Sequence, residues 1–207
     1  MPRPRSLTHT DIASAALAVI DRDGLAALSM RAVAVELGMA TMSLYRYVTD
    51  REQLEGLVVD LVLSDADLTP PRGGSWSERV TVLAERVRDV IGAHPNVVPL
   101  TLTHRHSSAA VLRWAEVVLA VLTEAGFTGE KRVVALRGVL AYLIGSIQLE
   151  HLGPLSGPAT ATMAGLPRAQ FPLLAQTARQ ARDVTPPEEF RRGLAALLRG
   201  LGSCLDE

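Results

Sequence analysis

The sequence has one cysteine, few aromatic residues and no long uninterrupted apolar run. Cys204 stands alone among 207 residues, which excludes an internal disulfide and a cysteine-built zinc site and suits a reducing cytosol. Apolar runs such as residues 117–122 fall far short of the roughly 20 residues that a membrane span needs. Residues 1–6 are charged and do not resemble a secretory leader. These features predict a cytoplasmic protein without a membrane segment.

An excess of charge of one sign is also missing. The chain carries 21 basic and 22 acidic residues, a formal net charge of −1, and Lys131 is its only lysine. A nearly neutral protein has no global field that attracts nucleic acid, so any such binding must come from a local surface. With 48% hydrophobic residues, the composition is that of a folded globular chain and not of a disordered one.

Helical periodicity recurs along the chain, and no segment shows the alternation of a strand. Several residues are typical of helix starts, among them Thr8 with Asp11 and Thr185 with Glu188. The sequence therefore predicts an all-α protein. Residues 69–74 form the clearest break, and the Gly- and Pro-rich stretch 153–167 is expected to be a mobile loop. The segments expected to be helical are residues 8–23, 30–37, 41–48, 51–67, 75–94, 97–103, 108–125, 128–151, 168–183 and 185–205.

Two short helices on either side of Gly38 form a helix-turn-helix candidate. Its inner faces are apolar, with Met30, Val33, Ala34, Leu37, Leu44 and Val48. Its outer face is short, polar and aromatic, which suits entry into a major groove about 12 Å wide. A tyrosine hydroxyl can also reach a phosphate oxygen while its ring packs on the sugar edge. The simpler interpretation is that any all-α protein contains a short helix pair with a glycine between.

Residues 28–54, LSMRAVAVELGMATMSLYRYVTDREQL, match the pattern of the TetR family of transcriptional regulators almost position by position. From Thr8 to Leu57 the chain closely resembles the N-terminal domain of that family, most strongly its tetracycline-repressor branch. The resemblance implies a helix-turn-helix DNA-binding domain over residues 1–52 and a ligand-binding and dimerisation domain over residues 53–207. It implies a ligand-responsive regulator, most often a repressor, that binds a palindromic operator as a homodimer.

The resemblance also implies which residues contact DNA. Ser29 caps the helix that abuts the DNA backbone, Arg31 lies near its start, four residues fall where family members touch bases, and two tyrosines and Arg51 fall at phosphates. The nine are Ser29, Arg31, Thr41, Met42, Ser43, Tyr45, Arg46, Tyr47 and Arg51. Residues 1–51 hold six arginines and five acids, so only modest non-specific affinity is expected. Arg3 and Arg5 could form a minor-groove arm, although a solvated start is the simpler interpretation.

Two C-terminal helices predict a dimer interface. The helix over residues 128–151 is apolar almost all round, which indicates burial on more than one side, and the helix over 185–205 carries one leucine-rich stripe. Each has two glycines seven residues apart, so small residues share one face of the helix. The resemblance implies a four-helix bundle built from these helices of two subunits. The alternative is that both helices fill a monomer core.

Aromatic and polar residues of the middle helices are candidates for lining an enclosed, mostly apolar ligand cavity. They are His94, His104, His106, Trp114, Phe127, Tyr142, Gln148, Glu150 and His151. His104 and His106 could suggest a metal, but side chains two residues apart on a helix diverge. The sequence therefore points to no metal or cofactor, and the expected ligand is a small apolar or aromatic molecule.

The resemblance implies a population shift: the ligand favours a conformation whose recognition helices no longer match the operator. Two other classes stay open, a helical metal-dependent enzyme that uses the five histidines and an adaptor that binds protein. The chain has no Gly-rich phosphate loop, no His-Glu-x-x-His and no nucleophile elbow, which weighs against an enzyme.

Overall fold

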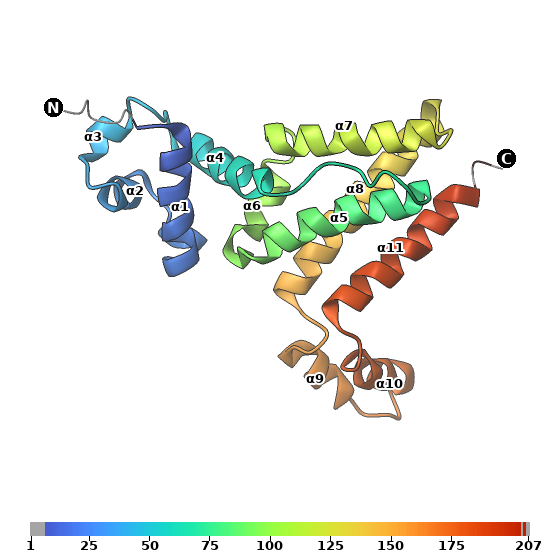
Figure 1. Cartoon of the computed structure of the whole chain (residues 1–207). Coiled ribbons are helices and arrows are strands. Elements are labelled where there is room, and N and C mark those ends of the chain that lie inside the picture. Colours follow the sequence, from blue (N-terminus) through green and yellow to red (C-terminus); the bar gives the residue numbers. More distant parts are fainter. Residues whose placement is uncertain (1–6, 204, 206–207) are drawn as a thin grey trace. The chain divides into compact units, whose positions relative to one another are not determined.

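The computed structural model describes residues 7–203 and 205, and no strand occurs among them (Figure 1). The all-α prediction is confirmed. The chain forms two compact units, the first running through Thr69 and adding Glu85–Val117, the second taking Pro70–Ala84 and the chain from Val118 onward. This division differs from the predicted functional boundary after residue 52, which stays a prediction.

Seven elements belong wholly to the first unit, together with the C-terminal part of α5 and the N-terminal part of α7. They are α1 (His9–Asp23), η1 (Leu25–Ala27), α2 (Met30–Glu36), α3 (Thr41–Leu44), α4 (Arg51–Ser64), η2 (Pro95–Val97) and α6 (Val98–Thr103). The core forms where α1 packs on α2 and α4, and the α1 residues predicted to face inward are buried there: Ile12, Ala16, Val19 and Ile20. The start of α1 is the predicted capping box, in which the Thr8 hydroxyl accepts from the Asp11 N–H at 3.1 Å and the Asp11 carboxylate accepts from the Thr8 N–H at 2.9 Å.

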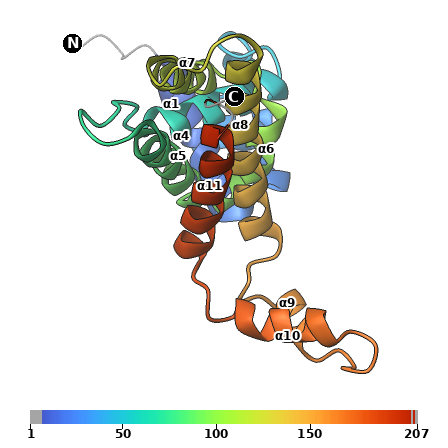
Figure 2. The ribbon, with the colours of Figure 1, turned by 90° about the vertical axis from the view of Figure 1, so that its right-hand side faces the viewer.

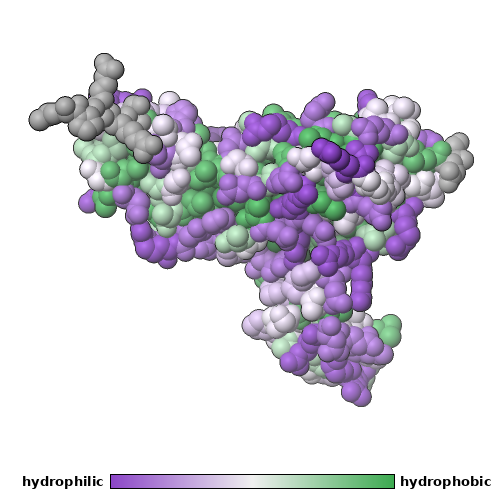
Figure 3. All heavy atoms as spheres, viewed as in Figure 1, coloured by the Kyte–Doolittle hydropathy of each residue, from purple (hydrophilic) through white to green (hydrophobic). Residues whose placement is uncertain are grey.

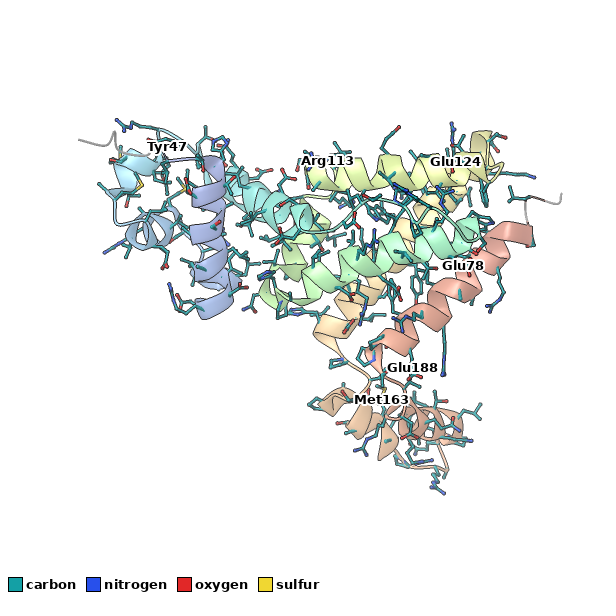
Figure 4. All side chains as sticks on the ribbon, in the orientation of Figure 1. Tyr47, Glu78, Arg113, Glu124, Met163 and Glu188 are labelled. Atoms are coloured by element: carbon teal, nitrogen blue, oxygen red, sulfur yellow. The ribbon has the colours of Figure 1, made fainter. Side chains whose placement is uncertain are left out.

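The second unit holds the remaining helices. They are α8 (Gly129–Leu152), α9 (Pro158–Ala164), α10 (Pro172–Ala181) and α11 (Pro186–Ser203), with the first part of α5 (Trp76–Gly92) and the last part of α7 (Ala109–Glu124). Helices α8 and α11 lie side by side (Figure 2). The helix start at Ser75 is a capping box with Glu78, and at the predicted start of α11 the N–H and hydroxyl of Thr185 donate to the Glu188 carboxylate (Figure 4).

Helix α8 carries two apolar stripes on opposite sides. Ala135, Val139, Leu143 and Ile147 are buried within the chain. At 100° per residue, a second stripe over Val134, Ala141, Gly145, Leu149 and Leu152 faces the other way, and Val134 is 61% exposed. The expectation of burial on more than one side is therefore not met inside one chain, because the chain covers only one stripe.

By length and composition alone, α8 is long and apolar enough to cross a membrane, and only 22% of its most apolar window is buried. This helix contains no long uninterrupted apolar run, because isolated charges such as Arg137 interrupt the sequence without making the helix polar. The core helix of a soluble protein passes the same test. Helix α8 therefore presents a long apolar surface that the described part of the chain leaves uncovered.

Two predicted segments need correction. The third helix ends at Leu44, not at residue 48, because residues 46 and 47 bond three residues back, from the Arg46 N–H to the Ser43 carbonyl and from the Tyr47 N–H to the Leu44 carbonyl. The stretch 153–167 is not all loop, since it contains α9. Pro158 takes the first helical position, where its fixed φ favours a helix start, and alanines follow.

Helices α9 and α10 pack mainly on each other. Ala175 and Ala178 are buried in this small contact, whereas Leu173 is exposed. Figure 3 shows hydrophobic atoms among the hydrophilic ones on this part of the molecule. Two helices of 7 and 10 residues are shorter than the ~12–15 residues at which isolated helices become even marginally stable, so their order depends on packing.

Candidate nucleic-acid interface

The first unit builds the helix-turn-helix through a capped start and a glycine turn. The hydroxyl of Ser29 accepts from the N–H of Ala32 at 3.1 Å, which satisfies one of the free donors at the start of α2. Gly38 follows α2 with φ +64°, and the N–H groups of Gly38 and Met39 bond back to the carbonyls of Val35 and Ala34. This is a Schellman turn, in which glycine adopts the left-handed conformation at no steric cost.

Helix α3 and the turn that follows it bury two apolar residues and expose much of the rest. Leu44 and Val48 are fully buried and fix the helix on the unit. Met42 is 77% exposed and Tyr45 and Arg46 are also exposed, while Thr41, Ser43 and Tyr47 are half-buried. Tyr47 lies in the turn that follows α3 (Figure 4). The predicted base-contact residues therefore share one short surface element, as entry into a groove requires.

The cations of this unit differ in how far they are neutralised. Arg22 bonds to Asp23 and Glu36, and the hydrogen bond to Asp23 raises its pKa further above the usual range. Arg31 and Arg46 are exposed and form no ion pair with the described residues. Arg51 is paired with Glu55 at 2.7 Å. The positive charge available to phosphate is thus concentrated at Arg31 and Arg46. Arg3 and Arg5 lie outside the described residues.

Sequence reasoning missed His9 at this surface. Its Nε2 lies 3.1 Å from the backbone carbonyl oxygen of Tyr47, 38 residues along the chain. Since a carbonyl oxygen can only accept, the ring donates. The contact joins the first turn of α1 to the turn after α3, and no periodicity or spacing in the sequence could have indicated it.

The predicted ligand-contact residues of the first unit have varied surroundings. His94 Nδ1 lies 2.8 Å from Asp21 Oδ2, and His104 Nε2 lies 3.3 Å from Glu55 Oε2. Trp114 is buried, whereas His106 is exposed. A cleft of about 390 Å³ runs between α4 and the α6–α7 turn, and its lining includes His104 with three carboxylates: Asp50, Glu52 and Asp60.

The other predicted ligand-contact residues belong to the second unit, where Phe127 is buried just before α8 and the rest lie on α8. The Tyr142 hydroxyl donates to the carbonyl of Phe190 on α11, Gln148 is half-buried, and His151 is exposed in the last turn. A separate groove of about 530 Å³, lined by Trp76, Leu198 and Arg199 among others, lies between α5 and α11. Within residues 7–203 and 205, no group of three or more His, Cys, Asp or Glu residues is placed to hold a metal ion.

Comparison with known proteins covers both parts of the chain. Residues 12–54 match the family described as bacterial regulatory proteins, tetR family, and residues 69–205 match the tetracyclin repressor-like C-terminal domain. An HTH-type transcriptional regulator of Saccharopolyspora erythraea is 33% identical over 146 residues, which cover 70% of this chain and 62% of that relative. The HTH-type transcriptional repressor DrrR1 of Streptomyces coeruleorubidus is 29% identical over 97% of this chain and 78% of its own length.

Solved structures agree with the fold. The TetR family protein ActR of Streptomyces coelicolor, in complex with actinorhodin, superposes with a TM-score of 0.81 at 25% identity, covering 96% of both chains. A helix-turn-helix unit with an exposed polar face, followed by a longer helical region, defines a ligand-responsive DNA-binding regulator. With both family domains matched in order, the chain belongs to the TetR family of transcriptional regulators.

Proposed function

We propose that the protein is a transcriptional repressor that binds a palindromic operator as a homodimer and is released by a small apolar or aromatic molecule. The observation that carries this proposal is the helix-turn-helix surface, where Met42 on α3 and Tyr45 and Arg46 in the turn after it are exposed beside the fully buried Leu44. Its setting within a chain whose residues 12–54 and 69–205 match the two TetR family domains supports the regulatory role. Such a protein would act in the cytoplasm.

The DNA contacts divide into two groups. Thr41, Met42, Ser43 and Arg46 are proposed to reach base edges and so to specify sequence. Ser29, Arg31, Tyr45, Tyr47 and Arg51 are proposed to contact phosphate or, for Arg31, a base edge as well. Because Arg31 and Arg46 form no ion pair with described residues, their charge is free for DNA.

The proposed dimer uses the second stripe of α8 together with α11. In the chain itself, a Cβ at Gly138 would lie 3.8 Å from Leu197 and Leu201, so this glycine serves the packing of α8 on α11. At Gly145 nothing lies within 4 Å of such a Cβ, which leaves room for a second copy to cover the exposed apolar stripe of α8.

For the ligand we propose a molecule that contacts the predicted residues of the middle helices. Three of these residues, His94, His104 and Tyr142, form hydrogen bonds within the chain that such a ligand would have to leave in place or replace. The name of the ActR structure, which includes actinorhodin, supports a small-molecule ligand in this family. Binding would favour a conformation with lower operator affinity.

The test is a selection of random duplex DNA by the purified protein. The expected product is an inverted repeat whose half-sites are centred about 34–36 Å apart, one helical turn of DNA. Arg46→Ala should then weaken binding to the repeat by about 1–3 kcal/mol if the side chain contacts a base bidentately. Arg113→Ala, which removes an exposed arginine from α7 (Figure 4), is the matched control and should bind normally.

Absence of enrichment with folded, ligand-free dimer would overturn the proposal. Protein that carries a ligand from the expression host is recognised by mass spectrometry of the same sample. Such protein is unfolded, dialysed and refolded before the selection is repeated.

A further inference from the structure

One carboxylate lies between the cation proposed to contact phosphate and the turn that follows α6. Oε1 of Glu55 accepts a hydrogen bond from Nε of Arg51 at 2.7 Å, one helical turn earlier on α4. Oε2 of the same carboxylate lies 3.3 Å from Nε2 of His104, the C-cap residue of α6. An ionised carboxylate has no proton to donate, so the His104 ring donates.

The side chains of His104, Glu55 and Arg51 differ in their exposed fraction, and the most exposed of them has the most freedom to move. The His104 side chain is 4% exposed, that of Glu55 15% and that of Arg51 49%. A buried imidazole in a packed core has little freedom to turn away. Glu55 is therefore held from the inside, whereas Arg51 is the surface partner that can exchange one anion for another.

The α6–α7 turn is tied to α4 a second time. Oδ1 of Asp60 accepts from the Ser108 hydroxyl at 2.6 Å and from the Ala110 N–H at 3.1 Å. Both contacts hold the start of α7 against α4, five residues after Glu55. A displacement of the turn therefore changes the surroundings of the Glu55 carboxylate directly.

Glu55 and a DNA phosphate would compete for one guanidinium. Nε of Arg51 is bonded to Glu55, and Nη2 donates to the carbonyl oxygen of Leu25 at 3.4 Å. A guanidinium whose charge is balanced by a carboxylate at contact distance attracts phosphate less strongly than a free one. Glu55 occupies Nε, so it must move away before that edge of the Arg51 guanidinium can contact phosphate.

We propose that Glu55 restrains Arg51, and that His104 positions Glu55 to do so, so that the turn after α6 sets how much of the Arg51 charge reaches DNA. This inference rests on the proposed function, in which Arg51 contacts phosphate. It identifies Glu55 and His104 as positioning residues that touch no DNA themselves. It also provides a route by which a change at the end of α6 alters DNA affinity through one side chain.

The experiment measures binding of the full-length protein to random-sequence duplex DNA as a function of salt. Glu55→Gln removes the charge and keeps the shape. It should tighten binding by up to roughly tenfold at 0.1 M salt and steepen the slope of log K against log salt by about 0.9, the value for one added phosphate contact. Glu52→Gln, an exposed acid beside Arg51 that makes no ion pair with described residues, is the matched control and should leave the slope near wild type.

A double-mutant cycle separates restraint of Arg51 from a general loss of negative charge. Arg51→Ala should flatten the slope, and Glu55→Gln should have no further effect in that background. An unchanged slope for Glu55→Gln, or the same steepening in the Arg51→Ala background, would overturn the restraint. If Glu55→Gln does not fold by circular dichroism, Glu55→Ala gives the same expectation.

Two further variants test the part played by His104. His104→Leu removes the donor and should move the slope in the same direction as Glu55→Gln, while His104→Gln keeps a donor and should restore it. No effect of His104→Leu would overturn the link to α6. If Arg51→Ala leaves DNA binding unchanged, the phosphate contact itself is wrong, and the inference fails together with that part of the proposed function.

Discussion

The ring of Tyr142 packs against that of Phe190 with centroids 5.6 Å apart, and its hydroxyl donates to the Phe190 carbonyl at 3.0 Å. One side chain thus joins the middle of α8 to the first turns of α11 by an apolar and a polar contact. Gly193 makes this approach possible, because a Cβ built at that position would overlap the Tyr142 hydroxyl. The glycine is required by packing, since its helical conformation is open to any residue.

Gly193→Ala should therefore destabilise the protein by roughly 1–3 kcal/mol, the usual cost of overpacking, despite the better helix propensity of alanine. Gly92→Ala, at the end of α5 where nothing lies within 4 Å, is the control and should be neutral or stabilising. Urea unfolding followed by circular dichroism measures both. A Gly193→Ala variant as stable as wild type would contradict the packing described for Tyr142.

Ser29 is expected to serve both folding and DNA binding, and two substitutions separate the roles. Ser29→Ala removes the hydrogen bond to the Ala32 N–H and should cost about 1 kcal/mol of stability. Ser29→Asp keeps a capping oxygen, so stability should be retained, but it adds a negative charge beside the proposed phosphate contact. Its affinity for duplex DNA should fall. Equal DNA affinity of wild type and Ser29→Asp would place Ser29 away from the backbone.

The start of α11 should lose stability in acid. Hydrogen bonds from the Thr185 hydroxyl and N–H hold the pKa of Glu188 below its usual value. A carboxyl whose pKa is lower in the folded state stabilises above its unfolded pKa, and this contribution is lost as the pH falls through the folded value.

Glu188→Gln should consequently lower the melting temperature most at neutral pH, and the difference from wild type should shrink below about pH 4, near the ordinary pKa of a glutamate. Thermal unfolding at a series of pH values gives the comparison. A difference that stays constant down to pH 3 would show that the charge of Glu188 contributes nothing at this helix start.

The proposed dimer predicts that a charge in the second stripe of α8 separates the subunits. Ala141→Glu should sediment at the chain mass of 22.2 kDa instead of twice that value, because an unpaired carboxylate in an apolar interface is costly. Ala120→Glu, at an exposed alanine on α7, is the control and should stay dimeric. A dimeric Ala141→Glu variant would move the interface elsewhere.

Local signals in the sequence predicted most of the fold. Capping boxes such as that of Thr8 and Asp11 placed helix starts correctly, because a cap depends on residues only three apart. The Gly38 turn was predicted for the same reason. Helix α9 was missed because Gly and Pro dominate the composition of its surroundings, although Pro158 marks its start.

The candidate site was predictable to the extent that it is local. Residues on and around α3 were identified from one short match, and their exposure on the helix agrees with that position. Contacts between residues far apart in the sequence could not be predicted, such as Glu55 with His104 and His9 with the Tyr47 carbonyl. They arise from tertiary packing, which one sequence does not encode in any spacing.

The opposed stripes of α8 couple folding to protein concentration. One stripe is buried by its own chain, and the other, which includes Val134 and Leu152, is left open. When a second copy covers that stripe, only the assembled state gains its burial, so the melting temperature rises with protein concentration by mass action. At low protein concentration, dissociation of this proposed dimer would then lower the amount of folded protein.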